Sequence, residues 1–182
     1  MKTGKTNKSV PLVIFLCSVI ANTSLCLSAD PDTVTFTVKT YDGLVLPAQV
    51  IKSHTPQNKM ILFINGSTPY DEKGNIGAFW TEEGSIVAEK HDFYLRFLDI
   101  MSAKGYSVAT VAKRSFVYPT RLPRPDLTDL AMDIRFFIDE LNRTGLLKKE
   151  KDLVIAGYSE GSIVATKVLS MLKNQPLACI LL

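Results

Sequence analysis

The sequence predicts an α/β fold with a mostly parallel sheet that opens with an N-terminal β-hairpin. Two observations lead to this fold class. First, two segments compatible with strands are joined by the turn-forming pair Asp42-Gly43. Second, short continuous apolar runs, typical of strands buried on both faces, then alternate with longer segments of helical spacing. Such an alternation winds a parallel sheet through right-handed crossovers.

The predicted hairpin covers residues 33–52. Its first strand alternates apolar and polar residues over positions 33–39, which is the pattern of a strand with one buried face. The pair Asp42-Gly43 forms the turn, and residues 45–52 return as the second strand. The mature chain is therefore expected to begin with two antiparallel strands.

Four further strands and three helices are expected after the hairpin. The strands are apolar runs, and the helices have apolar residues at helical spacing. A long polar connection, residues 65–92, separates the first of these strands from the first helix, and connections of this length are usually functional or mobile. We expect strands at residues 60–64, 106–111, 152–156 and 177–182, and helices at 93–103, 127–142 and 162–172.

Length and composition predict a single globular domain behind a signal peptide. The chain has 182 residues, of which 46% are hydrophobic and 21% charged, which is ordinary for a folded protein. Residues 1–29 carry three lysines, an apolar stretch at 10–21 and small residues before Asp30, the pattern of a secretory signal. The domain then covers residues 30–182.

The length of the apolar stretch at 10–21 also predicts where the protein is located. It is shorter than the roughly 20 residues that a membrane-spanning helix needs. We therefore expect an exported protein, periplasmic or secreted, without a stable membrane span after signal removal. A retained N-terminal anchor is the alternative interpretation.

The charge balance gives no reason to expect nucleic acid as a partner. Without residues 1–29 the chain loses three of its 21 basic residues and no acid, which leaves 18 of each sign. Cys17 and Cys26 would leave with the signal, so Cys179 has no partner for an internal disulfide. No metal-ligand spacing is present, and we expect neither a metal nor a cofactor.

Residues 157–161 read Gly-Tyr-Ser-Glu-Gly and lie between an apolar run and a predicted helix. A G-x-S-x-G segment in this position describes a nucleophile elbow, which lifts a serine hydroxyl above an α/β sheet. Ser159 is the candidate nucleophile. The alternative is purely structural, because Gly157 and Gly161 could simply permit tight packing between strand and helix.

A serine nucleophile also needs donors that hold a developing oxyanion. In an elbow, the backbone N–H of the residue after the nucleophile, here Glu160, is one such donor. The second should come from the loop after the third strand, where the sequence reads Asn65-Gly66-Ser67. Gly66 would allow the backbone to come close to the substrate.

Four segments carry a resemblance to a known family. They are Ile-Asn-Gly-Ser-Thr-Pro-Tyr-Asp-Glu-Lys-Gly-Asn at 64–75, Gly-Tyr-Ser-Val at 105–108, Lys-Arg at 113–114, and Gly-Tyr-Ser-Glu-Gly at 157–161. Over residues 33–182 the chain resembles bacterial α/β-hydrolases of the esterase and serine-aminopeptidase-like branch, which includes proteins like dienelactone hydrolase. The resemblance implies the α/β-hydrolase fold and an acyl-enzyme on the serine, formed from carboxylic esters or small amides and peptides.

The resemblance also implies roles for individual residues. Ser159 would be the nucleophile, the backbone N–H groups of Glu160 and Ser67 would hold the oxyanion, and Gly66 and Tyr158 would contact a small-molecule ester or amide substrate. Members of this family place an aspartate and a histidine after the nucleophile. No aspartate or histidine follows Ser159 in this sequence, and the only glutamate there is Glu160.

Neither histidine before the elbow is expected to act as the base. His54 falls in the turn between the second and third strands, and His91 leads into a helix. The chain is therefore expected to be the N-terminal part of a hydrolase domain, lacking its C-terminal strands and helices and nearly inactive by itself. Two alternatives remain open: complementation by a separately encoded C-terminal half, and a non-catalytic binding or oligomerising module that self-associates through residues 177–182.

Overall fold

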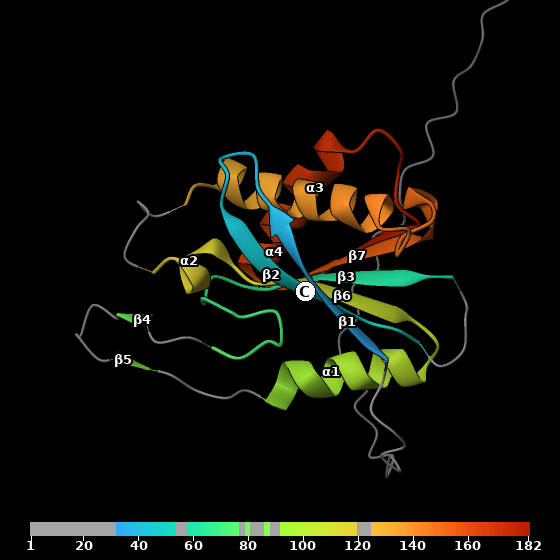
Figure 1. The fold of residues 1–182 in the computed structure, drawn as a ribbon, viewed down its shortest axis with the longest axis horizontal. Helices are drawn as coiled ribbons and strands as arrows, with labels where there is room; N and C mark the ends of the chain where they lie inside the picture. The colour runs from blue at the N-terminus through green and yellow to red at the C-terminus, as the bar shows by residue number, and fades with distance from the viewer. Residues whose placement is uncertain (1–31, 54–57, 77–78, 81–85, 88–91, 120–124) are drawn as a thin grey trace, which may run out of the picture.

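The computed structural model describes residues 32–53, 58–76, 79–80, 86–87, 92–119 and 125–182 (Figure 1). The predicted signal peptide, residues 1–29, lies outside the described residues, as do His54 and His91. None of the helices in the described ranges combines the length and apolar character that a membrane crossing requires.

The described chain forms a six-stranded sheet in the order β1-β2-β6-β3-β7-β8. The first two strands are an antiparallel hairpin, and β2 also pairs antiparallel with β6. The pairs β6–β3, β3–β7 and β7–β8 are parallel. This confirms the predicted fold class of a mostly parallel sheet opened by a hairpin. The strands are β1 Thr33–Lys39, β2 Val45–Ile51, β3 Met60–Ile64, β6 Ser107–Val111, β7 Leu153–Gly157 and β8 Ala178–Leu181.

Helices cover both faces of the sheet (Figure 1). On one face lies α1, Asp92–Ala103, and on the other lie α3, Leu127–Arg143, and α4, Glu160–Met171. Four short elements were not expected from the sequence: α2 Arg114–Val117, the 3-10 turn Glu150–Asp152, and the two-stranded ribbon of β4 Phe79–Trp80 and β5 Ile86–Val87.

The larger part of the core lies between the sheet and the pair α3 and α4. In α3, Phe137, Ile138 and Leu141 are fully buried, as the helical spacing predicts. Asp126 caps this helix in a reciprocal capping box with Asp129, which fixes where the helix begins. The smaller part lies under α1, where the rings of Phe63 and Phe97 are 5.0 Å apart.

The order of the strands places the ends of β3, β6 and β7 side by side at one edge of the sheet. Ile64, the last residue of β3, is paired with Gly157, the last residue of β7. The loop after β6 leads within three residues into α2. The two segments singled out in the sequence, 65–67 and 157–161, therefore start from adjacent strands.

Candidate active site

Ser159 lies in a sharp turn between β7 and α4. Its backbone has φ 53° and ψ −121°, and its side chain is exposed. A positive φ is unusual for a residue with a Cβ and costs of order 1–3 kcal/mol, so the surrounding structure must hold it in place. The structure records no hydrogen bond from the Ser159 side chain to the described backbone of α4. This is the geometry that presents a hydroxyl outward above the sheet edge.

The two glycines of the segment permit close contact between backbones. A Cβ on Gly157 would lie 2.4 Å from the carbonyl oxygen of Gly161. A Cβ on Gly161 would lie 2.2 Å from the carbonyl oxygen of Ile64, at the end of β3. The packing role that the sequence left open is therefore present, and the same packing brings the start of α4 against the neighbouring strand.

We expect the substitution Gly161→Ala to destabilise the protein strongly. The added methyl group meets backbone atoms, which cannot rotate away, so the cost should be about 3 kcal/mol or more, at or above the upper end of the overpacking range. Chemical denaturation measures the change. Gly145→Ala is the matched control, because that Cβ meets nothing within 4 Å and adds only the strain of a positive φ of 74°. Equal losses for the two variants would contradict the packing described here.

The loop after β3 lies directly against the turn that carries Ser159. A Cβ on Gly66 would be 3.3 Å from the Cβ of Ser159 and 3.4 Å from Cδ1 of Tyr158. The backbone N–H of Tyr158 donates to the carbonyl oxygen of Ile64 at 3.0 Å. The structure thus brings Gly66, Tyr158 and Ser159 together at this edge of the sheet.

Two backbone N–H groups near Ser159 are available as donors. In the part of the chain that the structure describes, the N–H of Ser67 donates to no protein acceptor. The N–H of Glu160 belongs to the first turn of α4, where N–H groups have no acceptor within the helix. The next two N–H groups, those of Gly161 and Ser162, donate back to Tyr158 and Ser159.

Hydrogen bonds within the loop and to the sheet hold the segment that follows Ser67 in place. The Asp71 carboxylate accepts the backbone N–H groups of Lys73 and Asn75, at 2.9 and 2.7 Å. The carbonyl oxygen of Glu72 accepts both Gln49 Nε2, at 2.8 Å, and Thr110 Oγ1, at 2.5 Å. These bonds fix residues 70–76 against β2 and β6, so the loop is part of the rigid scaffold.

Lys113 was not recognised as part of a site from the sequence, and it contacts both segments. Its ammonium group donates to the carbonyl oxygen of Gly66 and lies 2.7 Å from Glu160 Oε2. Burial lowers the pKa of Lys113, and the bond with Glu160 acts in the opposite direction. In the sequence, the Lys-Arg pair at 113–114 is only one segment of the family resemblance. The feature that could have indicated its role is its position just after β6.

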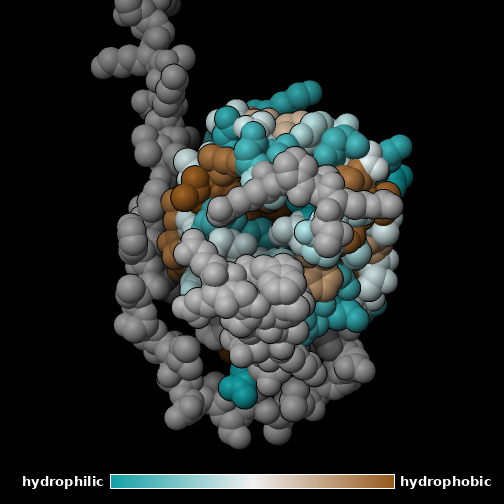
Figure 2. Space-filling model, turned by 90° about the vertical axis from the view of Figure 1, so that its left-hand side faces the viewer, coloured by the Kyte–Doolittle hydropathy of each residue, from teal (hydrophilic) through white to brown (hydrophobic). Residues whose placement is uncertain are grey.

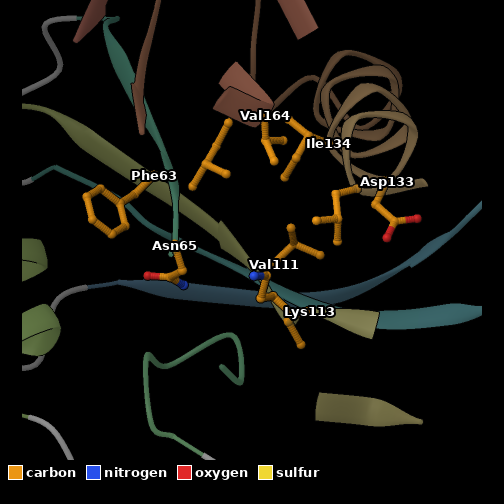
Figure 3. A pocket seen from close by; sticks show the side chains of 10 residues that line it. Phe63, Asn65, Val111, Lys113, Asp133, Ile134 and Val164 are labelled. Atoms are coloured by element: carbon orange, nitrogen blue, oxygen red, sulfur yellow. The ribbon is translucent and has the colours of Figure 1, made fainter. Parts of the chain in front are cut away.

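A small cavity of about 30 Å³ lies behind these contacts, between α3, α4 and the sheet. Figure 3 shows Asn65 and Lys113 on the sheet side of it, with Ile134 and Val164 from the two helices across from them. Its size suits about one water molecule. The buried Oδ1 of Asn65 has no hydrogen-bond partner among the described residues.

The carboxyl ends of the parallel strands lie on the side of the molecule where α2 is drawn in Figure 1. Seen from that side, the described residues include both hydrophilic and hydrophobic ones (Figure 2). Open α/β sheets bind ligands outside the carboxyl ends of their strands. Ser159 and Gly66 therefore occupy the edge at which a substrate site is expected.

Similarity to solved structures identifies the fold. Dienelactone hydrolase from Anabaena variabilis superposes with a TM-score of 0.59 at 14% identity, over 83% of this chain and 62% of that one. The esterase Pf2001 of Pyrococcus furiosus gives a TM-score of 0.56 at 17% identity, over 80% of this chain and 49% of that one. The chain has the α/β-hydrolase fold.

Other α/β-hydrolases agree with this result. An acylaminoacyl peptidase in complex with a chloromethyl ketone matches 81% of this chain and 22% of its own length, with a TM-score of 0.56 at 17% identity. The chain thus spans at most about three fifths of the length of these α/β-hydrolases. No protein-family model matches the sequence, and no curated protein is similar to it.

Proposed function

We propose that this chain carries the nucleophile and the oxyanion donors of an exported serine hydrolase that cleaves carboxylic esters or small amides. The observation that supports this most is the strained, outward-facing Ser159, packed against a loop glycine and flanked by two N–H groups with no helix or loop acceptor. A purely structural turn has no need of that strain.

The reaction follows from the placement of these groups. The Ser159 hydroxyl loses its proton to a base while its oxygen attacks the carbonyl carbon of the substrate. The carbonyl oxygen becomes an oxyanion, which accepts hydrogen bonds from the N–H groups of Ser67 and Glu160. Collapse expels the alcohol or amine, which takes up the proton held by the base, and leaves an acyl group on Ser159. Water, deprotonated by the same base, then attacks the acyl carbon and releases the carboxylic acid and free Ser159.

We assign neither the base nor the acid that orients it to any of the described residues. We propose that other parts of the whole protein, meaning the complete product of the gene that encodes this chain, supply them. The shares of the compared hydrolases that this chain covers, 49% of the esterase and 62% of the dienelactone hydrolase, support this proposal.

The substrate class rests on the neighbours and on the surface beside Ser159. The compared proteins include esterases and an acylaminoacyl peptidase. The exposed side chains of Tyr158 and Ile163 flank the turn and offer apolar contact to an acyl or leaving group. An exported location is part of the proposal and rests on the signal-peptide pattern of residues 1–29.

Ester hydrolysis by the whole protein tests the proposal. We would incubate it with p-nitrophenyl acetate, p-nitrophenyl butyrate and an aminoacyl p-nitroanilide and follow the release of chromophore. The expected result is turnover of at least one substrate, with a burst equal to the enzyme concentration if deacylation is slow. If none of the three substrates is turned over and no burst appears, the chain is not part of a hydrolase of this class.

A specific observation favours a second candidate function. Strand β8 is the last strand of the described sheet, and Leu177 and Leu182 beside it are half exposed. An edge strand can pair with a strand of another chain. If the chain is a binding or self-associating module, sedimentation should show a soluble oligomer. Denaturation should show that this oligomer unfolds cooperatively. Formation of insoluble aggregate alone would exclude this candidate.

A further inference from the structure

We propose that Lys113 is a positioning residue that sets the direction of both oxyanion donors. This inference rests on the proposed function, because it concerns the same two N–H groups. Lys113 follows β6 directly, and its side chain is 12% exposed. Among the described residues it is the one cation whose hydrogen bonds join the loop after β3 to the turn at Ser159.

The bond to the loop controls the Ser67 N–H through the geometry of the peptide group. The carbonyl of Gly66 and the N–H of Ser67 belong to the same peptide unit, which is planar and trans. Carbonyl and N–H therefore point in opposite directions. When the ammonium group of Lys113 holds the Gly66 oxygen on its side, the Ser67 N–H must point away from Lys113. Without that bond the peptide can rotate and the donor loses its direction.

The same bond strengthens the donor. A charged donor on a carbonyl oxygen polarises the peptide group, and hydrogen bonds along such a chain reinforce one another. The Ser67 N–H thus becomes a better donor to an oxyanion while Lys113 is bound to Gly66. An apolar side chain at 113 would fill space but would leave the peptide unpolarised.

The second bond acts on the other donor. Glu160 supplies its backbone N–H from the first turn of α4, and its carboxylate lies 2.7 Å from the Lys113 ammonium. This ion pair ties the first turn to the loop and so fixes the spacing between the two N–H groups. It also neutralises a carboxylate next to Ser159, which would otherwise repel the oxyanion.

The surrounding contacts hold Lys113 itself in place. Its backbone N–H donates to the carbonyl oxygen of Tyr70 at 2.9 Å, within the same loop. The preceding residue, Ala112, donates to Pro47 at 2.8 Å. The lysine is therefore fixed at its backbone as well as at its ammonium group, and a positioning role needs both.

The test compares Lys113→Met with Lys104→Met in the whole protein. Lys104 is an exposed lysine just after α1, so its substitution controls for the loss of one charge. Two quantities are measured: kcat and KM for the best ester, and the amide signals of Ser67 and Glu160 in ¹⁵N–¹H spectra. We expect Lys113→Met to lower kcat about 10²-fold, the scale for loss of one oxyanion donor, with KM nearly unchanged. Both amide signals should shift, and Lys104→Met should change neither quantity.

Glu160→Gln keeps the proposal testable if Lys113→Met does not fold. It retains the shape of the side chain and removes only the ion pair, and we expect the Ser67 amide signal to shift and kcat to fall about tenfold. The inference is overturned if a folded variant keeps the wild-type Ser67 amide signal and a kcat within twofold. If the wild-type protein hydrolyses no ester, the proposed function fails instead, and the amide signals still decide whether Lys113 orients the two groups.

Discussion

Replacing Ser159 with alanine is expected to lower kcat of the whole protein by about 10⁶-fold and to leave KM nearly unchanged. Without the hydroxyl no acyl-enzyme can form. Substrate binding and oxyanion stabilisation remain, and together they accelerate the reaction about 10³–10⁴-fold over the reaction in water. The exposed position of Ser159 means that the methyl side chain disturbs no packing. Alanine also keeps a Cβ at the positive φ of 53°, so the strain of the turn is retained.

Ser170→Ala is the control for this substitution. Ser170 is an exposed serine near the other end of α4, and its hydroxyl donates to the carbonyl oxygen of Lys167. Its loss should leave kcat within twofold. If Ser159→Ala retained wild-type kcat, another group would have to be the nucleophile, and the assignment of the turn would be wrong.

Replacing Arg114 with methionine should destabilise the fold by about 3–5 kcal/mol, the cost of removing one partner from a buried ion pair. The side chains of Arg114 and Asp133 are only 4% and 6% exposed. Nε and Nη2 of Arg114 contact the two oxygens of Asp133 at 2.7 and 2.5 Å, and Nη1 contacts Asp42 at 3.0 Å. Methionine leaves the Asp133 carboxylate buried without a counter-ion. Urea denaturation measures the loss.

The double variant Arg114→Met with Asp133→Leu separates charge from packing. Because replacement of a whole buried pair by apolar residues is often neutral or stabilising, it should recover most of the loss. A double variant as unstable as Arg114→Met alone would show that the loss comes from packing around the stem of Arg114. Lys148→Met, at an exposed lysine, controls for the removed charge.

The same pair predicts a dependence on pH. Burial raises the pKa of Asp133, and the bond to Arg114 acts in the opposite direction. Without Arg114 that pKa should be higher still. A carboxyl with a raised pKa in the folded state destabilises the fold above that pKa, and the cost disappears below its value in the unfolded chain, about 4. The stability gap between Arg114→Met and the double variant should therefore narrow as pH falls toward about 4.

Much of the fold could be predicted from the sequence because the elements have strong local patterns. The run at Met60–Ile64 is buried at every position, as a continuous apolar strand should be. Helix α3 ends at Arg143, one residue beyond the prediction. Gly105, two residues after the end of α1, has a φ of 93°, which few other residues adopt.

The order of the strands could not be predicted, because it depends on contacts between segments far apart in the sequence. β2 pairs with β6 and not with β3, its successor in the chain. The short helix α2 has only four residues, too few for a helical period to appear. It begins at Arg114, whose side chain bonds to Asp42 in the hairpin turn and to Asp133 in α3.

The candidate site, too, could be predicted only where the sequence has a local signature. The sequence singled out the segments at Gly66 and Ser159, because glycine and serine in a strand-to-helix turn have a local signature. It did not indicate that Lys113 would join them, since a lysine after a strand is usually solvated. Its burial follows from the parallel pairing of β6 with β3, which places the ends of the two strands next to each other.

The most direct test of Ser159 as a nucleophile is covalent labelling of the whole protein with a fluorophosphonate, followed by intact mass and peptide mapping. We predict one adduct per chain, located on Ser159, formed by the folded protein and lost after heat denaturation and in Ser159→Ala. Labelling of a different serine, or no adduct on a folded protein that carries the complete domain, would contradict the assignment.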